Sequence, residues 1–416
     1  MLVEIAKNFG TPLYVYDSKV IEERCQNLTM ATGGFADIFY SLKANPNIAI
    51  AQLLKACGAN AEVCSLSELM TALEVGFVPE NIIFVGPCKS NEEITLALEC
   101  NIYAIVCESV HELKRVDELA QKKGKIASIL LRINPDFYVE KAPLKMGGVP
   151  SQFGVDLTEL TIDSPVQNFS HLKLKGIHVY NGTRILDAEG LAKNMEKIFA
   201  LAERLSEDWE LEFECLDLGG GFGVPYFDNE KALDIGRLTE LLVPLFQKSK
   251  QKNPQMRLII ESGRYLVAES GAFISKVCDV KQSHGEHFLV TDGGMNCHMA
   301  ATGIGALLKR NFPIVTLSHP EAREIDHKTP YNITGPLCTP GDLIGRDVML
   351  PKMKVGDYVA ILVAGAYGPS ASPVLFLSHG HPAEVLIYKG EAQLIRKKDS
   401  ANNILQNQIK IKMEES

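Results

Sequence analysis

The residues of this 416-residue sequence that could carry out chemistry stand at the ends of short apolar runs, and Lys43 is the first of them. Lys43 directly follows the run "DIFYSL" (37–42) and precedes Asn45 and Pro46, a pair that stops a strand. A lysine at the end of a buried strand is costly unless it is paired with an acid or used in a reaction. Lys43 is therefore a candidate for covalent chemistry, and a salt-bridged or solvent-directed lysine is the alternative.

A glycine-rich turn, "LGGGFG" (218–223), follows a later apolar run. Glycines let backbone N–H groups approach an anion such as a phosphate closely. The turn is not a Walker A motif, because no Gly-Lys-Ser/Thr follows it. A tight turn that serves only close packing is the alternative.

The segment "ESGR" (261–264) ends a further apolar run and places Glu261 near Arg264. An amine that binds covalently, a phosphate cradle and an acid for a ring nitrogen together predict a pyridoxal phosphate site. In this interpretation Glu261 keeps the pyridine nitrogen protonated, which favours the loss of CO₂ from Cα. An ion pair between Glu261 and Arg264 is the alternative.

Two Gly/Pro-rich loops near the end of the chain add further candidates. "GPLCTPGD" (335–342) contains Cys338 and Asp342, and "GAYG" (365–368) contains Tyr367. A cysteine between turn residues is a candidate proton donor, although many lone cysteines are small buried hydrophobes. A phenol in such a loop can reach a phosphate or can simply pack. No metal site is predicted, because the pair His379 and His381 lacks a third ligand nearby in the sequence.

The scaffold that must position these side chains alternates between strand-like and helical patterns from about residue 35 to 265. This alternation predicts an α/β fold with an eight-stranded (β/α)8 TIM barrel, and a doubly wound sheet is the alternative. Active sites of such barrels lie at the carboxyl ends of the strands. The predicted strands are 37–42, 61–65, 82–86, 102–107, 128–134, 175–180, 215–220 and 257–262.

After about residue 265 the pattern changes to β-like runs separated by Gly, Pro and Asp turns. We therefore expect a barrel domain over residues 25–265 and a C-terminal β domain over residues 266–416. The N-terminal run "TPLYVYD" (11–17) has no helix pattern of its own. We expect residues 1–24 to join the β domain through this strand.

Composition restricts the class of protein. The chain is 46% hydrophobic and 22% charged, and its net charge of −9 argues against nucleic acid or an anionic membrane as the main partner. The sequence shows neither a signal peptide nor an apolar run long enough to span a membrane. The ten cysteines form no CxxC pairs. We therefore expect reduced thiols and a cytoplasmic location.

The motifs "YSLKAN", "LDLGGGFG", "ESGR", "DGGMN", "GPLCTPGD" and "GAYG" occur in this order and resemble those of the group IV decarboxylases of the alanine racemase fold (fold type III). The resemblance implies a pyridoxal 5′-phosphate cofactor, a barrel with a β domain, and a homodimer with shared active sites. It places the covalent cofactor bond on Lys43 and the proton donor on Cys338, the latter supplied by the second subunit. The cofactor contacts that it implies are Lys43, Glu62, His178, Tyr180, Thr183, Gly219, Gly220, Gly221, Glu261, Gly263, Arg264 and Tyr367. The substrate contacts that it implies are Arg264, Asp342 and Tyr367.

Within this family, "KMGGVPSQFGVD" (145–156), "GIHVYNGT" (176–183) and "IIESGRYL" (259–266) resemble the branch that decarboxylates L-glutamyl groups on acyl-carrier proteins in antibiotic biosynthesis. Tyr180 stands where the diaminopimelate enzymes have a histidine that stacks on the cofactor. Thr339 stands where those enzymes have a glutamate, and their Arg-Pro-x-Leu-Tyr after "GMN" is missing. A site built for a second ammonium and carboxylate loses much when their partners are absent, so diaminopimelate is a poor candidate substrate.

The resemblance therefore implies an amino acid substrate held as a thioester on a carrier protein. Lys309 and Arg310 are candidates for a basic surface that binds an acidic carrier, and a solvated loop is the alternative. A decarboxylase of free ornithine or lysine, a racemase and a non-catalytic cofactor-binding protein are the other hypotheses. The intact cysteine loop argues against a non-catalytic protein, and Glu261 argues against a racemase.

Overall fold

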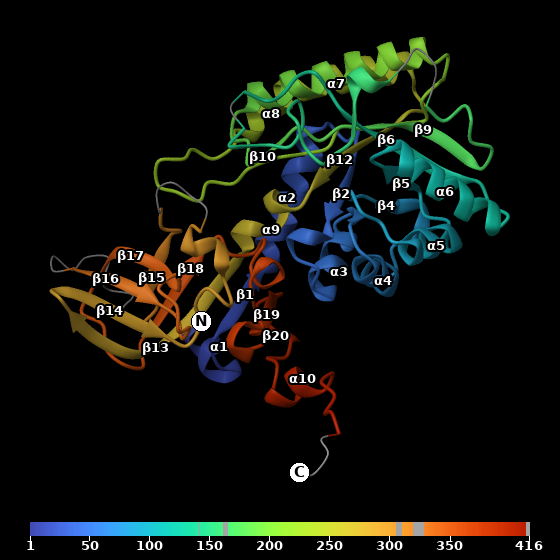
Figure 1. Ribbon diagram of the computed structural model, residues 1–416. Coiled ribbons are helices and arrows are strands. Elements are labelled where there is room, and N and C mark those ends of the chain that lie inside the picture. The colour runs from blue at the N-terminus through green and yellow to red at the C-terminus, as the bar shows by residue number, and fades with distance from the viewer. Residues whose placement is uncertain (141, 161–164, 305–309, 319–327, 413–416) are drawn as a thin grey trace. The chain divides into compact units, whose positions relative to one another are not determined.

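The computed structural model describes residues 1–140, 142–160, 165–304, 310–318 and 328–412 (Figure 1). The chain divides into two compact units. One unit comprises Val20–Val267, and the other comprises Met1–Lys19 together with Ala268–Ser416.

The first unit contains a closed barrel of parallel strands. Neighbouring strands pair in parallel around the ring, and the ring closes because β5 pairs with both β4 and β6 while β12 pairs with β2. A doubly wound sheet has two open edges, so the closure confirms the predicted barrel and excludes the alternative. The ring consists of β2 (Asp37–Ser41), β3 (Asn60–Val63), β4 (Ile82–Phe84), β5 (Ala104–Cys107), β6 (Ala127–Asn134), β9 (Leu172–His178), β11 (Cys215–Asp217) and β12 (Arg257–Ser262).

Helices surround this barrel, and Figure 1 shows α7 and α8 packed side by side along it. Several helices are capped by a side chain from the loop after the preceding strand, which accepts a hydrogen bond from a first-turn N–H group. Such caps satisfy donors that no helical carbonyl can reach, and they fix where each helix begins. The capping residues are Asn47, Ser65, Ser90 and Ser109. The helices are α2 (Ser18–Ala31), α3 (Ile48–Ala56), α4 (Leu66–Val75), α5 (Asn91–Cys100), α6 (Val110–Lys122), α7 (Ala188–Asp208), α8 (Ile235–Lys252) and α9 (Arg264–Val267).

Apolar side chains from the strands fill the inside of the barrel, as the burial of near-continuous apolar strands requires. Short strands lie beyond the ring. β8 (Val155–Asp156) pairs with β6, and β7 (Leu144–Lys145) pairs with β10 (Gly182–Thr183). One buried cluster comprises Phe39, Ile83, Val85, Ala104, Val106, Leu130, Cys215 and Ile259.

The second unit is built on a mostly antiparallel sheet. The strand predicted from "TPLYVYD" is β1, and it lies between β13 and β19 with Leu13 opposite both Ile274 and Ala383. Its helices are α1 (Leu2–Phe9) and α10 (Ala401–Leu405). Its strands are β1 (Leu13–Asp17), β13 (Gly271–Ser283), β14 (Glu286–Thr291), β15 (Ile314–Thr316), β16 (Thr329–Thr334), β17 (Leu343–Leu350), β18 (Tyr358–Leu362), β19 (Ala383–Tyr388) and β20 (Glu391–Arg396).

Two whole-chain features complete the description. All ten cysteines, which lie within the described residues, are free thiols. In the part of the chain that the structure describes, no helix combines the length and apolar character needed to cross a membrane.

Candidate active site

Lys43 and Glu62 form an ion pair at the carboxyl ends of β2 and β3. Lys43 lies in the short 3₁₀ segment η1 (Leu42–Ala44), and its Nζ is 2.9 Å from Oε1 of Glu62. The Glu62 side chain is fully buried, whereas that of Lys43 is 38% exposed. The Cys64 thiol donates a second hydrogen bond, of 3.1 Å, to the same oxygen. Lys43 is thus salt-bridged, and its amine is also accessible and held in place, so the predicted covalent role of Lys43 remains a prediction.

Three buried side chains meet at the carboxyl ends of β9, β11 and β12, and we call them the acid–histidine cluster: His178, Asp217 and Glu261. One ring nitrogen of His178 and one carboxylate oxygen from each of Asp217 and Glu261 lie within 4.8 Å of one another. Nε2 of His178 is 3.2 Å from Oε1 of Glu261. Parallel strands end at the same edge of a barrel, so residues far apart in sequence converge here.

The surroundings of the two acids in the acid–histidine cluster shift their pKa values in opposite directions. Burial, and then the neighbouring Glu261 carboxylate, raise the pKa of Asp217 well above its usual range. Burial also acts to raise the pKa of Glu261, but His178, together with Lys43 and Arg132, outweighs it, so the pKa of Glu261 is lowered. Two carboxyl groups this close in a buried site do not both ionise readily. The pKa values of Asp217 and Glu261 are therefore shifted in opposite directions.

Hydrogen bonds join the glycine turn after β11 to Asp217 and to Glu261 in the neighbouring strand β12. The N–H of Gly219 donates to Oδ1 of Asp217 over 2.9 Å, and the N–H of Glu261 donates to the carbonyl of Gly219 over 2.8 Å. A Cβ at Gly220 would collide with the carbonyl oxygen of Glu261. Gly221 has a φ of +93°, which side chains other than glycine rarely adopt. Close packing by itself thus requires glycine here, and the predicted contact with phosphate remains a prediction.

Arg264 begins α9 directly after β12, and its Nη1 donates a 2.7 Å hydrogen bond to the hydroxyl of Tyr226. Tyr226 is buried and was missed at the sequence level. An aromatic residue a few positions after the glycine turn was its only signal. Gly263 lies against η1, where an added Cβ would stand 2.8 Å from the Cβ of Ala44. Thr183 lies in β10.

Three of the predicted site residues, Cys338, Asp342 and Tyr367, lie in the second unit. Cys338 is exposed in the loop between β16 and β17. Tyr367 has a positive φ of 55°, an uncommon conformation that often marks functional loops. Their predicted contacts with the cofactor and substrate remain predictions.

Asp342 holds the backbone of the cysteine loop. Its side chain is buried, and its two carboxylate oxygens accept hydrogen bonds from the N–H groups of Met295 (2.6 Å) and Leu337 (2.8 Å). Both oxygens are therefore used to hold the cysteine loop. The predicted contact between Asp342 and substrate remains a prediction, and the carboxylate would make it in addition to the two backbone bonds.

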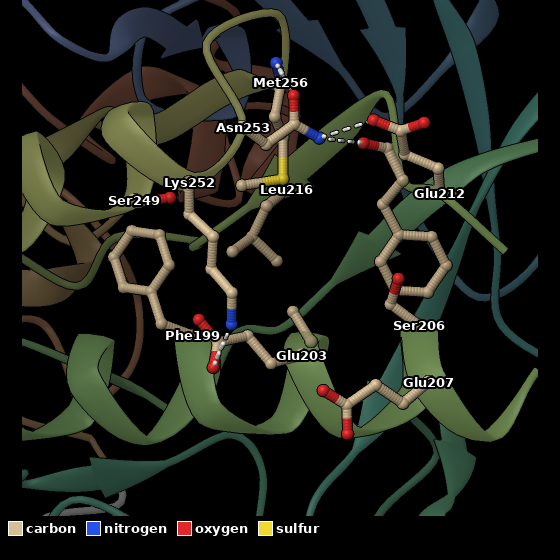
Figure 2. A pocket seen from close by; sticks show the side chains of 12 residues that line it. Phe199, Glu203, Ser206, Glu207, Glu212, Leu216, Ser249, Lys252, Asn253 and Met256 are labelled. Carbon is tan, nitrogen blue, oxygen red and sulfur yellow. Dashed lines mark hydrogen bonds and ion pairs between the residues drawn. The ribbon is translucent and has the colours of Figure 1, made fainter. Parts of the chain in front are cut away.

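A pocket of about 210 Å³ opens at the other end of the barrel, between α7 and α8 (Figure 2). Figure 2 shows Lys252 directed at Glu203, to which it is paired over 3.1 Å, and Asn253 turned toward Glu212. Glu212 precedes β11 and Met256 precedes β12, so this pocket lies at the amino ends of the strands. Barrel chemistry takes place at the carboxyl ends, and the acid–histidine cluster is there.

The acid–histidine cluster suits a cofactor with a protonated ring nitrogen. Within the described chain, Nδ1 of His178, Oδ2 of Asp217 and Oε1 of Glu261 are buried and make no hydrogen bond of good geometry. Buried polar atoms are normally satisfied, and unsatisfied ones at the barrel end that also carries the accessible amine of Lys43 indicate a bound group. Pyridoxal phosphate supplies the ring N–H that Glu261 lacks and the aldehyde that Lys43 can bind. The residues present therefore fit this cofactor.

Comparison with known proteins agrees with this geometry. Residues 18–268 match the family described as "Pyridoxal-dependent decarboxylase, pyridoxal binding domain". The chain belongs to this family, and it is a pyridoxal-phosphate-dependent amino acid decarboxylase. The predicted family, fold, cofactor and enzyme class are thereby confirmed.

Similar proteins extend over nearly the whole chain. It is 42% identical to the L-glutamyl-[BtrI acyl-carrier protein] decarboxylase of Niallia circulans, covering 98% of this chain and 96% of that one. It is 34% identical to the diaminopimelate decarboxylase of Aquifex aeolicus, covering 99% and 94%. The crystal structure of a diaminopimelate decarboxylase from M. jannaschii superposes with a TM-score of 0.88 at 29% identity, covering 98% and 94%.

Proposed function

We propose that this enzyme removes the α-carboxylate of an L-glutamyl or similar aminoacyl group attached through its side chain to an acyl-carrier protein. The product is then a γ-aminobutyryl-type thioester. The observation that carries the proposal is the 42% identity, over 98% of the chain, with a relative named for that substrate. The setting that we propose is a pathway of antibiotic or similar secondary metabolism.

The cysteine loop supports a substrate without a charged far end. Thr339 follows Cys338, where a carboxylate would be needed to bind a distal ammonium. The nearby Asp342 is buried with both oxygens bonded to backbone N–H groups. A free diamino acid would leave its second ammonium without a partner in this loop, which is costly in a closed site.

Each step of the proposed decarboxylation is assigned to a residue of this chain. Bound pyridoxal phosphate supplies a protonated ring that takes up the electron pair released as CO₂ leaves. Lys43 is the amine that binds the cofactor, and Glu62 holds that amine in position. Glu261 is the ionised partner of the ring nitrogen. Cys338 returns a proton to Cα of the substrate.

The remaining assignments concern the cofactor's surroundings. The residues near the phosphate are Thr183, Gly219, Gly220, Gly221, Gly263, Arg264 and Tyr367. Tyr180 would lie beside the cofactor ring, since the centroid of the Tyr180 ring is 5.9 Å from Nζ of Lys43. Arg264 and Tyr367 also face the substrate. His178 supports Glu261, which is 3.2 Å away.

We also propose a cytoplasmic homodimer in which the loop carrying Cys338 completes the site of the other subunit. Mixing the inactive variants K43A and C338A tests this arrangement. Activity that appears only after the two are mixed supports shared sites. Mixtures that stay inactive, although subunit exchange is verified, contradict them.

Mass spectrometry tests the substrate. The purified enzyme is incubated separately with glutamyl-carrier thioester and with free glutamate, ornithine, lysine and diaminopimelate. We expect loss of the mass of CO₂ from the thioester alone, with K43A as the inactive control. Turnover of free ornithine or lysine instead would assign the enzyme to the second candidate function, a free amino acid decarboxylase.

The carrier surface was predicted at Lys309 and Arg310. Lys309 lies outside the described residues, and Arg310 is exposed. Charge reversal at Arg310 should therefore lower carrier-dependent turnover while leaving cofactor binding unchanged, if this residue meets an acidic carrier.

A further inference from the structure

Asp217 has no role in the chemistry described so far, although it is fully buried in the acid–histidine cluster. Its Oδ1 accepts the N–H of Gly219 over 2.9 Å. Its Oδ2 is buried without a hydrogen bond of good geometry in the described chain. One oxygen is therefore committed to the glycine turn, and the other faces the cluster.

The same turn is bonded to Glu261 from the other side. The backbone N–H of Glu261 donates to the carbonyl of Gly219 over 2.8 Å, and Gly220 packs against the carbonyl of Glu261. Asp217, the glycine turn and Glu261 are thus linked by hydrogen bonds at the carboxyl end of the barrel. These bonds connect Glu261, which we assigned to the cofactor's ring nitrogen, with the turn, which we assigned to its phosphate.

The neighbouring groups and the bond that Oδ1 accepts indicate which oxygen of Asp217 carries a proton. The ligand atoms of Asp217 and Glu261 lie within 4.8 Å of each other and of His178. His178 is 3.2 Å from Oε1 of Glu261 and lowers the pKa of that carboxyl group. Burial and Glu261 raise the pKa of Asp217. Oδ1 is already an acceptor, so the hydrogen of Asp217 belongs on Oδ2.

We propose that Asp217 is a positioning residue that stays protonated on Oδ2 and donates a hydrogen bond to Glu261, holding that carboxylate in place for the cofactor's ring nitrogen. The proposal rests on the role assigned to Glu261 under the proposed function. Asp217 itself touches neither cofactor nor substrate. It acts by orienting Glu261 and by fixing the N–H of Gly219.

Two substitutions separate a hydrogen-bond donor from a charge. D217N keeps an acceptor for Gly219 and replaces O–H by N–H as the donor to Glu261. D217L has a similar volume but offers neither. D136N, at an exposed position in the loop after β6, is the matched control.

The first readout is the dissociation constant of pyridoxal phosphate for the cofactor-free enzyme, measured by absorbance. Because no substrate is added, the result is independent of whether the natural substrate is carrier-bound. We expect D217N to bind within about threefold of the wild type and D217L to bind about 10- to 100-fold more weakly, the range for a lost hydrogen bond to a charged group. In an E261Q background, D217L should add little, because the two residues act as one unit.

The second readout is the infrared band of a buried protonated carboxyl group at neutral pH. The wild type and D136N should show a component of this band that D217N lacks, while the contribution of Glu68, whose pKa burial raises to about 7, stays in all three. Cofactor binding that is equally weak in D217N and D217L would overturn the proposal, because it would mean that the negative charge matters. Absence of that component from the wild type would overturn it too, even if D217L failed to fold.

Discussion

The cysteine loop depends on Asp342, and the substitution D342N tests that dependence. The carboxylate accepts one backbone hydrogen bond on each oxygen, of 2.6 Å from Met295 and 2.8 Å from Leu337. An added Cβ at Gly294 or Gly335 would run into these same oxygens, so glycine at both positions lets the backbone close around the acid. The amide side chain introduced by D342N can accept only one of the two bonds and turns an N–H group toward the other donor.

The magnitude follows from these contacts. A hydrogen bond to a charged group contributes about 1.5–3 kcal/mol, and a buried donor left unsatisfied costs about 1–3 kcal/mol. D342N should therefore lower the free energy of unfolding by about 3 kcal/mol. A domain of ordinary stability, about 5–15 kcal/mol, survives this loss, so the variant should fold and can be measured.

Urea unfolding followed by circular dichroism at pH 7 is the assay, with D347N as the control. Asp347 is exposed in the same unit with a φ of +51°, a conformation that asparagine tolerates, so D347N should change the stability by less than about 0.5 kcal/mol. A D342N enzyme as stable as the wild type but with a raised KM would refute the reasoning. That result would support the predicted contact between Asp342 and substrate.

Two further predictions concern pH and packing. Burial lowers the pKa of His298 from 6.5 to about 4, so the unfolded chain binds a proton in this window that the folded chain does not. The free energy of unfolding should therefore fall by about 3 kcal/mol as the pH drops from 6.5 to 4. In H298Q this fall should be correspondingly smaller, as measured by urea unfolding across that pH range. In G220A the new Cβ collides with the carbonyl of Glu261, so the variant should lose pyridoxal phosphate binding, measured by absorbance.

Controls for these two predictions come from exposed positions. H111Q removes an exposed histidine on α6 and should leave the pH dependence of stability unchanged. G236A adds a methyl group in the first turn of α8, where the nearest atom is 3.4 Å away, and should not weaken cofactor binding. Equal pH profiles for H298Q and the wild type, or full cofactor binding by G220A, would contradict the respective prediction.

The barrel was predictable from sequence because each of its strands is a short apolar run followed by a turn or a helix cap. The predicted run 257–262 coincides with β12 (Arg257–Ser262). The predicted run 215–220 overshoots β11, which ends at Asp217, because Gly219 turns to a φ of +61°. The pattern of apolar residues predicts which residues are buried, but it does not show where a glycine leaves the extended conformation and ends the strand.

The site was predictable where a residue type has few structural uses, as with Lys43 at the end of a buried strand. The sequence could not show where the oxygens of Asp342 point, because a loop carboxylate can bind a ligand or hold a backbone equally well. Asp217 went unnoticed for a related reason. Its significance depends on its distance from His178 and Glu261, and distances between strands appear only once the barrel closes. An acid inside an otherwise apolar run was the available signal.

The position of β1 has a consequence for biosynthesis. This strand leaves the ribosome well before its partners, β13 and β19, the second of which ends at Tyr388. At about 5–20 residues per second, the nascent strand waits roughly 20–70 s for its last neighbour, while the barrel segment can fold in between. During that interval its apolar residues and unpaired backbone are open to other chains. Newly made protein should therefore be most prone to misassociate before residue 388 emerges, and a holding chaperone would act on the N-terminal strand.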